Sequence, residues 1–572
     1  MSENKEQDLI MNLEYLLTGA EMASCDARTS NVIGIPSLVL MERAALSVAD
    51  GVDVFLRKYF PRKSGGRGPV VLAAAGRGNN GADALAAGRI LLDRGYDVRF
   101  CRLSGKISPE SSFAVQERIL DHYGAQVEEF SGCSPGTLSA GQEDAAPGGA
   151  QIPDVIIDGL FGTGLSRELA GEAAECVAMI NRCRDLYGSY VVAVDIPSGI
   201  SSDDGRVMGC AVRCDETRTF AFYKRGHFMY PGTLYAGTCH LAQIGITSRA
   251  FAQKPGMFTL MEAGAADLLP ARHPGGNKGT FGKVLLVAGR RKMCGAALLA
   301  AQACMAAGAG MVKIFTHEAN RLIVQQALPE ALLETFAEED AQEEIAGRLR
   351  SSLAWADIAA AGPAMGTDAA AGSILRLILQ YAQEEKALRG LVLDADAIRL
   401  MAGDQSLRQL AAGRSPEIPC VLTPHMAEFA ALAGKSIGEC IAGRTALVRE
   451  QAQSLRCTIA CKDARTLVSG PSGRQYLNTT GNSGMAAAGS GDVLTGITAA
   501  FLALDFWQKE SGTAAEGKLF SAEECAGGFA AAVSAVCLHG IAGDLAARVY
   551  GEQGMTAKDL CGELRKASFW QA

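Results

Sequence analysis

Apolar runs alternate with helix-length segments through the first half of the chain. Four such runs, Val70–Ala73, Tyr96–Leu103, Val155–Asp158 and Val191–Asp195, predict strands, and a helical pattern covers about 82–94. Runs that are apolar at consecutive positions suit strands buried on both faces. This alternation therefore predicts a parallel sheet with helices on both sides.

The same alternation stops near Ile246 and resumes at Lys283–Val287, after a polar connector at 247–258. Further strands are expected at 356–361, 390–394, 420–423, 457–461 and 465–468, and helices from Val493 to about 505 and around 524–545. We therefore expect an α/β protein of two domains, residues 1–250 and 251–572. Ligands of such sheets bind outside the carboxyl ends of the strands, where Gly-rich and acidic residues fall in both halves, so each domain is expected to carry a site.

Composition narrows the class of protein. The 572 residues are 48 % hydrophobic and 20 % charged, which is typical of a globular protein with ample core. The net charge of −8 argues against nucleic acid or an anionic membrane as a general partner. The 17 cysteines form no C-x-x-C pair and many lie in apolar runs, which predicts free thiols in a reducing cytoplasm.

Neither a secretory signal nor a membrane span is expected. The first residues are polar and of mixed charge, unlike a signal peptide. The uncharged stretch Cys294–Val312 is mostly Ala and Gly, so we interpret it as a packed internal helix. Cysteine and histidine show no metal-ligand spacing.

A Gly-rich loop near the C-terminus carries the most specific chemistry. Gly489, Ser490 and Gly491 precede Asp492 and an apolar, helix-compatible run. Backbone N–H groups at a helix N-terminus bind anions, and glycine lets the anion approach closely. A carboxylate at this position can act as a general base, which removes the proton of a hydroxyl group while that group is phosphorylated. The alternative is a helix cap with Asp492 as a partner of the helix dipole.

Three strand ends of the first half also carry polar motifs. Gly76-x-Gly78-x-x-Gly81 formally matches a dinucleotide motif, but the stretch 98–103 is basic where a dehydrogenase has an acid, so that function is only an alternative. Asn79–Asp83, Asp158–Arg167 and Asp195–Gly199 follow successive strands. With Tyr15–Met22 and Gly34–Glu42, this set resembles the NAD(P)H-hydrate epimerase domain over roughly residues 12–246.

That resemblance implies a Rossmann-like three-layer α/β/α domain with potassium at Asn80, Asp158 and Ser198. The turn 162–167 offers N–H groups and a guanidinium to a pyrophosphate. Asp195 is expected to transfer the proton, although an Asx-turn role before Pro197 is the alternative. Ala82 and Ala84 replace glycines of the family motif. The implied substrate-binding residues are Asn79, Asn80, Gly81, Ala82, Asp83, Gly162, Thr163, Gly164, Leu165, Ser166, Arg167, Glu168 and Asp195.

The second half contains a longer series of motifs. It comprises Lys278–Gly289, Gly295–Ala297, Gly362–Gly366, Leu393–Ala397, Leu422–Phe429, Lys462–Thr466, Asn482–Met485 and Gly489–Asp492. In this order they resemble the NAD(P)H-hydrate dehydratase family, whose domain is a ribokinase-like α/β fold, over about 268–569.

The resemblance implies that NAD(P)H damaged by hydration is restored at the expense of ADP or ATP, with magnesium as the phosphate counter-ion. Asp492 is the implied base. Ala296, Gly366, His425 and Asp492 are expected to contact the hydrated dinucleotide, and Lys462, Asp463, Ala464, Arg465, Thr466 and Gly491 the adenine nucleotide. His425 has the alternative role of a helix N-terminal residue, and we interpret His539 as a packing residue.

Asp463 and Arg465 replace glycines of the nucleotide segment. Asp463 is unfavourable beside a phosphate, and Arg465 is the residue expected to offset it. Nucleotide choice is therefore less well defined by the sequence than the fold.

Our main hypothesis is a bifunctional repair enzyme that acts on hydrated NADH and NADPH, called NADHX and NADPHX. It would interconvert their R and S epimers and dehydrate the S form. One alternative is a ribokinase-like small-molecule kinase with a non-catalytic dinucleotide-binding N-terminal domain. Another is a scaffold role for the first half, against which Asn80, Asp158, Asp195 and Ser198 argue. We expect a cytoplasmic homo-oligomer that binds no nucleic acid and no membrane.

Overall fold

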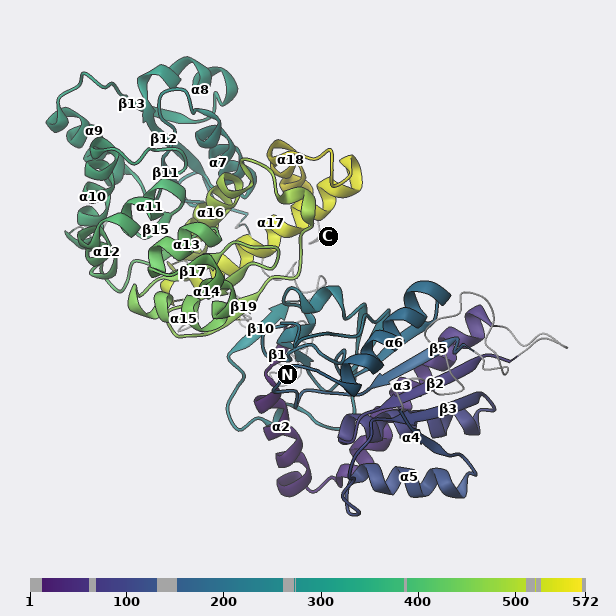
Figure 1. The fold of residues 1–572 in the computed structure, drawn as a ribbon. Helices are drawn as coiled ribbons and strands as arrows, with labels where there is room; N and C mark the ends of the chain where they lie inside the picture. The colour runs from purple at the N-terminus through teal and green to yellow at the C-terminus, as the bar shows by residue number, and fades with distance from the viewer. Residues whose placement is uncertain are drawn as a thin grey trace. The chain divides into compact units, whose positions relative to one another are not determined.

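The chain folds into two compact units. The computed structural model describes residues 13–60, 68–130, 152–260, 272, 274–384, 388–510, 520 and 526–567. One unit is Tyr15–Pro255, and the other is the described chain from Gly256 onward together with Leu13 and Glu14 (Figure 1).

The N-terminal unit is built on a seven-stranded sheet in which each neighbouring pair is parallel. Its order is β4 (Val127–Glu129), β3 (Asp97–Arg102), β2 (Val70–Ala75), β5 (Val155–Gly159), β6 (Tyr190–Val194), β7 (Glu216–Phe220) and β9 (Thr238–Ala242). Strand β2 is the first strand of this sheet along the chain. The chain adds β3 and β4 on one side of it and β5, β6, β7 and β9 on the other, so the topological switch point lies between β2 and β5. Ligands of doubly wound folds bind at that point.

Helices cover both faces of this sheet. They are α2 (Gly19–Arg28), α3 (Ser37–Tyr59), α4 (Asn79–Asp93), α5 (Ser112–His122) and α6 (Glu172–Tyr187). Val71 and Ala73 of β2 face the core shared with α3, α4 and α5, whereas Leu72 and Ala74 face the core under α6. This two-residue alternation produces the predicted three layers (Figure 1).

Two short strands of the same unit pair beside its sheet. Leu16 and Leu17 of β1 (Leu13–Leu17) lie parallel to Tyr223 and Lys224 of β8 (Tyr223–Lys224). Before the second unit, the connector expected at 247–258 contains a 3-10 turn at Ser248–Ala250. The predicted polar connector ends too late, because Met257 and Phe258 are buried and already belong to β10 (Met257–Leu260).

The second unit carries ten described strands in one sheet. The order is β13 (Leu332–Phe336), β12 (Met311–His317), β11 (Lys283–Val287), β14 (Ile358–Ala361), β15 (Gly390–Leu393), β16 (Cys420–Leu422), β17 (Thr458–Cys461), β18 (Leu467–Ser469), β19 (Gln475–Leu477) and β10. Strands β13 to β17 are parallel, and β17, β18 and β19 are antiparallel. Strands β14 to β17 therefore end at one edge of the sheet.

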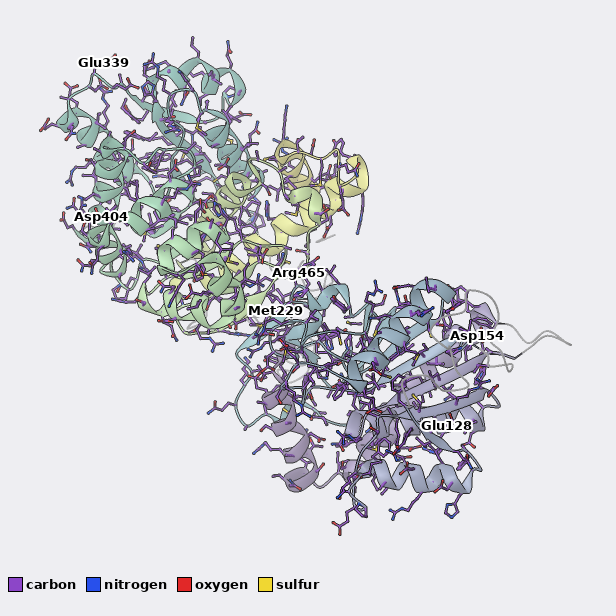
Figure 2. All side chains as sticks on the ribbon, viewed as in Figure 1. Glu128, Asp154, Met229, Glu339, Asp404 and Arg465 are labelled. Carbon is purple, nitrogen blue, oxygen red and sulfur yellow. The ribbon has the colours of Figure 1, made fainter. Side chains whose placement is uncertain are left out.

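Helices of the second unit form two layers (Figure 1). One layer contains α7 (Gly295–Ala306), α16 (Ser490–Glu510), α17 (Phe529–Tyr550) and α18 (Ala557–Ala567). The other helices are α8 (Arg321–Ala327), α9 (Gln342–Trp355), α10 (Ala369–Glu384), α11 (Ala395–Gly403), α12 (Gln405–Ala412), α13 (Met426–Ala433), α14 (Ile437–Ala442) and α15 (Arg444–Ser454). Asp404, labelled in Figure 2, caps α12 by accepting from the Ser406 N–H at 2.7 Å.

The sequence predicts one internal helix over Cys294–Val312, and the structure shows that this prediction is wrong. Helix α7 ends at Ala306, and Gly308 adopts a φ of 104°, which glycine tolerates best. Strand β12 then begins at Met311.

Among the described helices, α17 is the one long and apolar enough to cross a membrane, and 78 % of its most apolar window is buried inside the protein. Each cysteine in the described part of the chain is free, in agreement with the sequence.

Candidate active sites

A cavity of about 610 Å³ lies at the switch point of the N-terminal unit. The predicted residues that line it are Asn79, Asn80, Asp83, Gly162, Thr163, Gly164, Leu165, Ser166, Arg167 and Asp195. Gly81, Ala82 and Glu168 do not line it. Gly81 and Ala82 are buried within the unit, and Glu168 is exposed to solvent. The structure thus brings together motifs from three strand ends around one space.

Backbone crowding explains the glycines beside this cavity. A Cβ on Gly76 would lie 1.7 Å from the Leu160 carbonyl oxygen, and one on Gly81 would lie 1.9 Å from that of Gly76. Helix α4 begins at Asn79 and not near residue 82, so Asn79–Asp83 form its first turn. Ala82 and Ala84 are fully buried, and neither has a positive φ, so the loss of the family glycines causes no backbone strain.

Asp158 and Ser198 meet beneath the cavity. The Ser198 hydroxyl donates to Asp158 Oδ1 at 2.6 Å and the Ser198 N–H donates to Oδ2 at 2.8 Å. Asp158 is fully buried, no cationic side chain among the described residues pairs with it, and burial raises its pKa to about 6. Asn80 approaches from α4, and its buried Nδ2 atom has no described partner. The buried carboxylate of Asp158 has no cationic partner among the described residues, and it lies beside the Ser198 hydroxyl, so these oxygens fit a monovalent cation such as potassium.

Asp195 stands in a strained conformation directly after β6. Its φ is 64°, which is uncommon for a residue with a side chain. Oδ1 accepts from the Thr219 hydroxyl at 3.0 Å, from the Phe220 N–H at 3.2 Å and from Lys224 Nζ. These bonds are not those of a simple Asx-turn, because they come from β7 and β8. The motifs of the sequence did not point to Lys224 or to His227, whose ring contacts the Asp195 carbonyl.

Gly489–Asp492 begins α16 in the second unit. Gly489 has a φ of 93°, and the Ser490 N–H already donates to the Ala487 carbonyl at 3.2 Å. Within the described chain no group accepts from the N–H groups of Gly491 and Asp492. The Gly489 N–H has no acceptor there either, so the expected cradle keeps free N–H groups at Gly489 and Gly491, and Asp492 adds another. His539 is buried as expected, and its Nε2 atom also contacts the Ser490 hydroxyl at 3.2 Å.

Asp394 holds two residues of this site together. It is 1 % exposed and accepts from Lys462 Nζ at 2.8 Å and from the Thr495 hydroxyl at 2.7 Å. Lys462 lies over the start of α16, since a Cβ on Gly491 would be 3.1 Å from its Nζ. Burial, and then the charge of Asp394, raise the pKa of Asp492 to about 6. The result is a carboxyl tuned for proton transfer beside an ammonium group and free N–H groups.

An arginine outside the nucleotide segment neutralises the carboxylate within it. Asp463 pairs with Arg444, a buried residue that begins α15. Arg444 also donates to the Arg465 carbonyl at 3.1 Å. The Arg465 guanidinium instead donates to the Thr479 carbonyl at 2.6 Å (Arg465 is labelled in Figure 2). Arg444 is therefore a partner of Asp463 that the sequence motif did not include.

The remaining predicted residues lie at the ends of neighbouring strands. The Gly366 N–H donates to Asp396 Oδ2 at 2.9 Å, and Asp396 is itself close enough to act on Asp492. Ala296 is in the first turn of α7, whose Leu299 would lie 2.4 Å from a Cβ on Gly489.

His425 is the N-cap of α13. Its Nδ1 accepts from the Ala427 and Glu428 N–H groups, and its Nε2 lies 3.1 Å from Glu428 Oε1. The structure thus shows the alternative role foreseen for His425, while 46 % of its side chain stays exposed.

Comparison with known proteins decides the family. The model of the family described as NAD(P)H-hydrate dehydratase matches residues 284–566, and that described as YjeF-related protein N-terminus matches residues 37–226. The bifunctional NAD(P)H-hydrate repair enzyme Nnr of Moorella thermoacetica is 34 % identical over 550 residues, which are 96 % of this chain and 95 % of that protein. The chain belongs to the family of bifunctional NAD(P)H-hydrate repair enzymes.

A second repair enzyme matches the chain over the same length. The repair enzyme Nnr of Thermofilum pendens is 32 % identical and covers 96 % of this chain and 95 % of its own. Among solved structures, the ADP/ATP-dependent NAD(P)H-hydrate dehydratase of Bacillus subtilis is 26 % identical, with a TM-score of 0.42, over 54 % of this chain and 96 % of its own.

The expected order of an epimerase domain and a ribokinase-like dehydratase domain is confirmed at the level of the family. The chain is accordingly a multifunctional isomerase and lyase, and a NAD dehydrogenase is not supported.

Proposed function

We propose that each unit of this repair enzyme carries one of its two active sites, with Asp492 as the dehydratase base and Asp195 as the proton-transferring group of the epimerase. The observation that carries the dehydratase assignment is the placement of Asp492, half-buried beside Lys462 and two free N–H groups.

In the proposed dehydratase reaction, the hydroxyl of the S form attacks the terminal phosphoryl group of ADP or ATP. Asp492 takes the hydroxyl proton as the new O–P bond forms and the bond to the nucleotide breaks. Lys462 and the N–H groups of Gly491 and Asp492 stabilise the charge on the transferring phosphoryl. The phosphorylated ring then loses inorganic phosphate as its C–O bond breaks and the ring nitrogen supplies its lone pair to the carbon. Loss of a proton from the adjacent ring carbon to solvent forms the C=C bond, and NAD(P)H is restored. Hydroxide is a poor leaving group, which is why phosphorylation promotes the step.

We assign the nucleotide to Lys462, Asp463, Ala464, Arg465, Thr466 and Gly491, and the hydrated ring to Ala296, Gly366, His425 and Asp492. These residues lie at the carboxyl ends of strands or at the helix starts next to them. Both ring nitrogens of His425 bind within α13, so His425 would contact the ring of the substrate by packing. Magnesium is the proposed counter-ion of the nucleotide phosphates.

For the epimerase, the proposed dinucleotide site is the cavity lined by Asn79, Asn80, Asp83 and Gly162–Arg167. The turn at Gly162–Arg167 offers backbone N–H groups and a guanidinium to the pyrophosphate. Potassium would be held by Asp158, Ser198 and Asn80, where it would supply the positive charge that the buried carboxylate lacks.

We further propose that the enzyme works in the cytoplasm as a homo-oligomer without a nucleic-acid partner. The free thiols suit a reducing compartment, and the net charge of −8 disfavours polyanions. Light scattering after size-exclusion chromatography tests the oligomer.

Product analysis tests the proposal against a small-molecule kinase. With NADHX and a nucleotide labelled in its terminal phosphate, the label should be recovered as inorganic phosphate in step with NADH. Label that stays on a phosphorylated small molecule would show a kinase instead. The variant Asp492→Asn should abolish phosphate release and leave epimer exchange intact.

A further inference from the structure

Lys224 lies against the base of the proposed epimerase site, and sequence motifs did not point to it. Its side chain is fully buried at the end of β8, and it lines the cavity. Nζ donates to Asp195 Oδ1, to the Thr219 hydroxyl at 2.9 Å and to the Phe220 carbonyl at 3.2 Å. The three donors of the ammonium group are thereby used, so Lys224 acts on Asp195 and is not available to bind a phosphate of the substrate.

The turn after Lys224 holds Asp195 from the backbone side. His227 Nδ1 accepts from the Lys224 N–H at 3.1 Å, so Nε2 carries the proton and donates to the Asp195 carbonyl at 2.9 Å. Burial lowers the pKa of His227 to about 4, which keeps the ring neutral. Because a positive φ persists only where the surroundings fix it, this turn maintains the strained conformation of Asp195.

A second carboxyl, from the motif Asn79–Asp83, lines the same cavity. Asp83 is on the first turn of α4 and, among the described residues, pairs with no cation. Burial, and then the negative charges of Asp195 and of Asp26 on α2, raise the pKa of Asp83 well above its usual range. The other charged groups on this cavity are Arg77, Arg167 and Lys224. One carboxyl is therefore held beside an ammonium, and the other lies near two further carboxyls.

We propose that Lys224 is a positioning residue that holds the carboxylate of Asp195 in place as the base of epimerisation, and that Asp83 is the acid that works with it. This inference rests on the proposed epimerase function of the N-terminal unit. It assigns the two directions of proton transfer to two different carboxyls in one cavity.

The two roles balance over one turnover. Asp83 gives its proton to the ring hydroxyl as the C–O bond breaks, the bonding pair leaves with the oxygen as water, and the ring nitrogen supplies its lone pair to the carbon. Water adds to the opposite face, the nitrogen recovers its pair, and Asp195 takes the proton of the adding water. Solvent then returns that proton from Asp195 to Asp83, so no net proton is consumed.

The test measures epimer exchange by separating the R and S forms, with substrate affinity measured on the same full-length variants. Lys224→Met should slow exchange by about a hundredfold or more while substrate affinity stays within about threefold, since loss of acid–base assistance has this size. Exposed Lys58 on α3 provides the matched control, Lys58→Met, which should leave exchange unchanged. Thermal unfolding of each variant reports whether the unit remains folded.

Rescue separates a positioning role from a merely structural one. In Lys224→Ala, added ethylamine should restore part of the exchange, because a small ammonium can occupy the vacated space beside Asp195. Asp83→Asn keeps the size of the side chain, and should remove the loss of activity at alkaline pH along with most of the rate at neutral pH.

Two results would overturn the inference: a folded Lys224→Met variant that exchanges epimers at the wild-type rate, or an Asp83→Asn variant with the wild-type pH profile. Failure of ethylamine to restore any exchange would overturn the positioning role of Lys224. A wild-type chain that does not accelerate exchange at all would instead overturn the proposed epimerase function.

Discussion

Arg444 and Asp463 form an ion pair in which the guanidinium is buried and the carboxylate is 42 % exposed. Arg444 begins α15, whereas Asp463 lies in the segment that follows β17. This pair allows a carboxylate to replace a glycine beside the proposed nucleotide site without adding an uncompensated negative charge.

A double-mutant cycle tests that compensation. Arg444→Met should raise the KM for the nucleotide about tenfold, equal to about 1.4 kcal/mol, because Asp463 would then repel the phosphates. Asp463→Gly should change it little, and the double variant should return close to wild type. Initial rates of NADH formation with ADP and with ATP provide the measurement. A double variant as impaired as Arg444→Met alone would show that Arg444 acts by another route.

The dehydratase rate should depend on the ionisation of Asp492. Because burial and the charge of Asp394 raise the pKa of Asp492 to about 6, the carboxyl is protonated below that pH and cannot accept the hydroxyl proton. The rate at low substrate should therefore rise with pH through about 6 and reach a plateau above it. A rate that is flat between pH 5 and about 8 would contradict the role of Asp492 as base.

A side chain at Gly491 should displace Lys462. A Cβ there would lie 3.1 Å from Lys462 Nζ, which Asp394 already holds in place. Gly491→Ala should lower the dehydratase kcat by about a hundredfold, since a small misplacement at the reacting centre has that effect. The matched control is Gly372→Ala in α10, where a Cβ would meet nothing within 4 Å. That change should keep full activity and stabilise the helix by roughly 0.5–1 kcal/mol. Equal activity of the two variants would show that the start of α16 does not bind the phosphoryl group.

Replacement of potassium by choline should slow epimer exchange and leave dehydration of the S form unchanged. The reason is the buried Asp158 carboxylate, which accepts two bonds from Ser198 and has no described cationic partner. Ser198→Ala should reduce exchange by about tenfold to a hundredfold and raise the potassium concentration needed for half-maximal rate. Exchange that is independent of the monovalent cation would refute this site.

Much of the fold follows from patterns that are local in the sequence. The strands at Val155–Gly159 and Lys283–Val287 are apolar at almost every position, so their buried, parallel placement could be predicted. Short strands were missed where that pattern is absent: β9 (Thr238–Ala242) is half-exposed at the edge of its sheet. The loop at Gly308 was hidden inside an alanine-rich run, and there only the positive φ of one glycine separates helix from strand.

The sites were predictable where the chemistry lies in a contiguous motif. Asp492, Lys462 and the residues that line the N-terminal cavity belong to such motifs. Partners supplied from a distant segment were not predictable: Asp394 reaches Lys462 across 68 residues, and Lys224 reaches Asp195 across 29. The first of these contacts exists because parallel strands bring their carboxyl ends to one edge, and a single sequence does not show which side chains then meet.

The most direct test of two active sites in one chain follows NADH absorbance during repair of a mixed-epimer NADHX preparation, with magnesium, potassium and either ADP or ATP. The account predicts that all of the NADHX returns to NADH faster than the epimers exchange spontaneously. It also predicts that Asp195→Asn stops recovery near the share of the S form, whereas Asp492→Asn stops it completely. Recovery by the wild type that halts at the share of one epimer would contradict an active N-terminal site, and no recovery with either nucleotide would contradict the whole account.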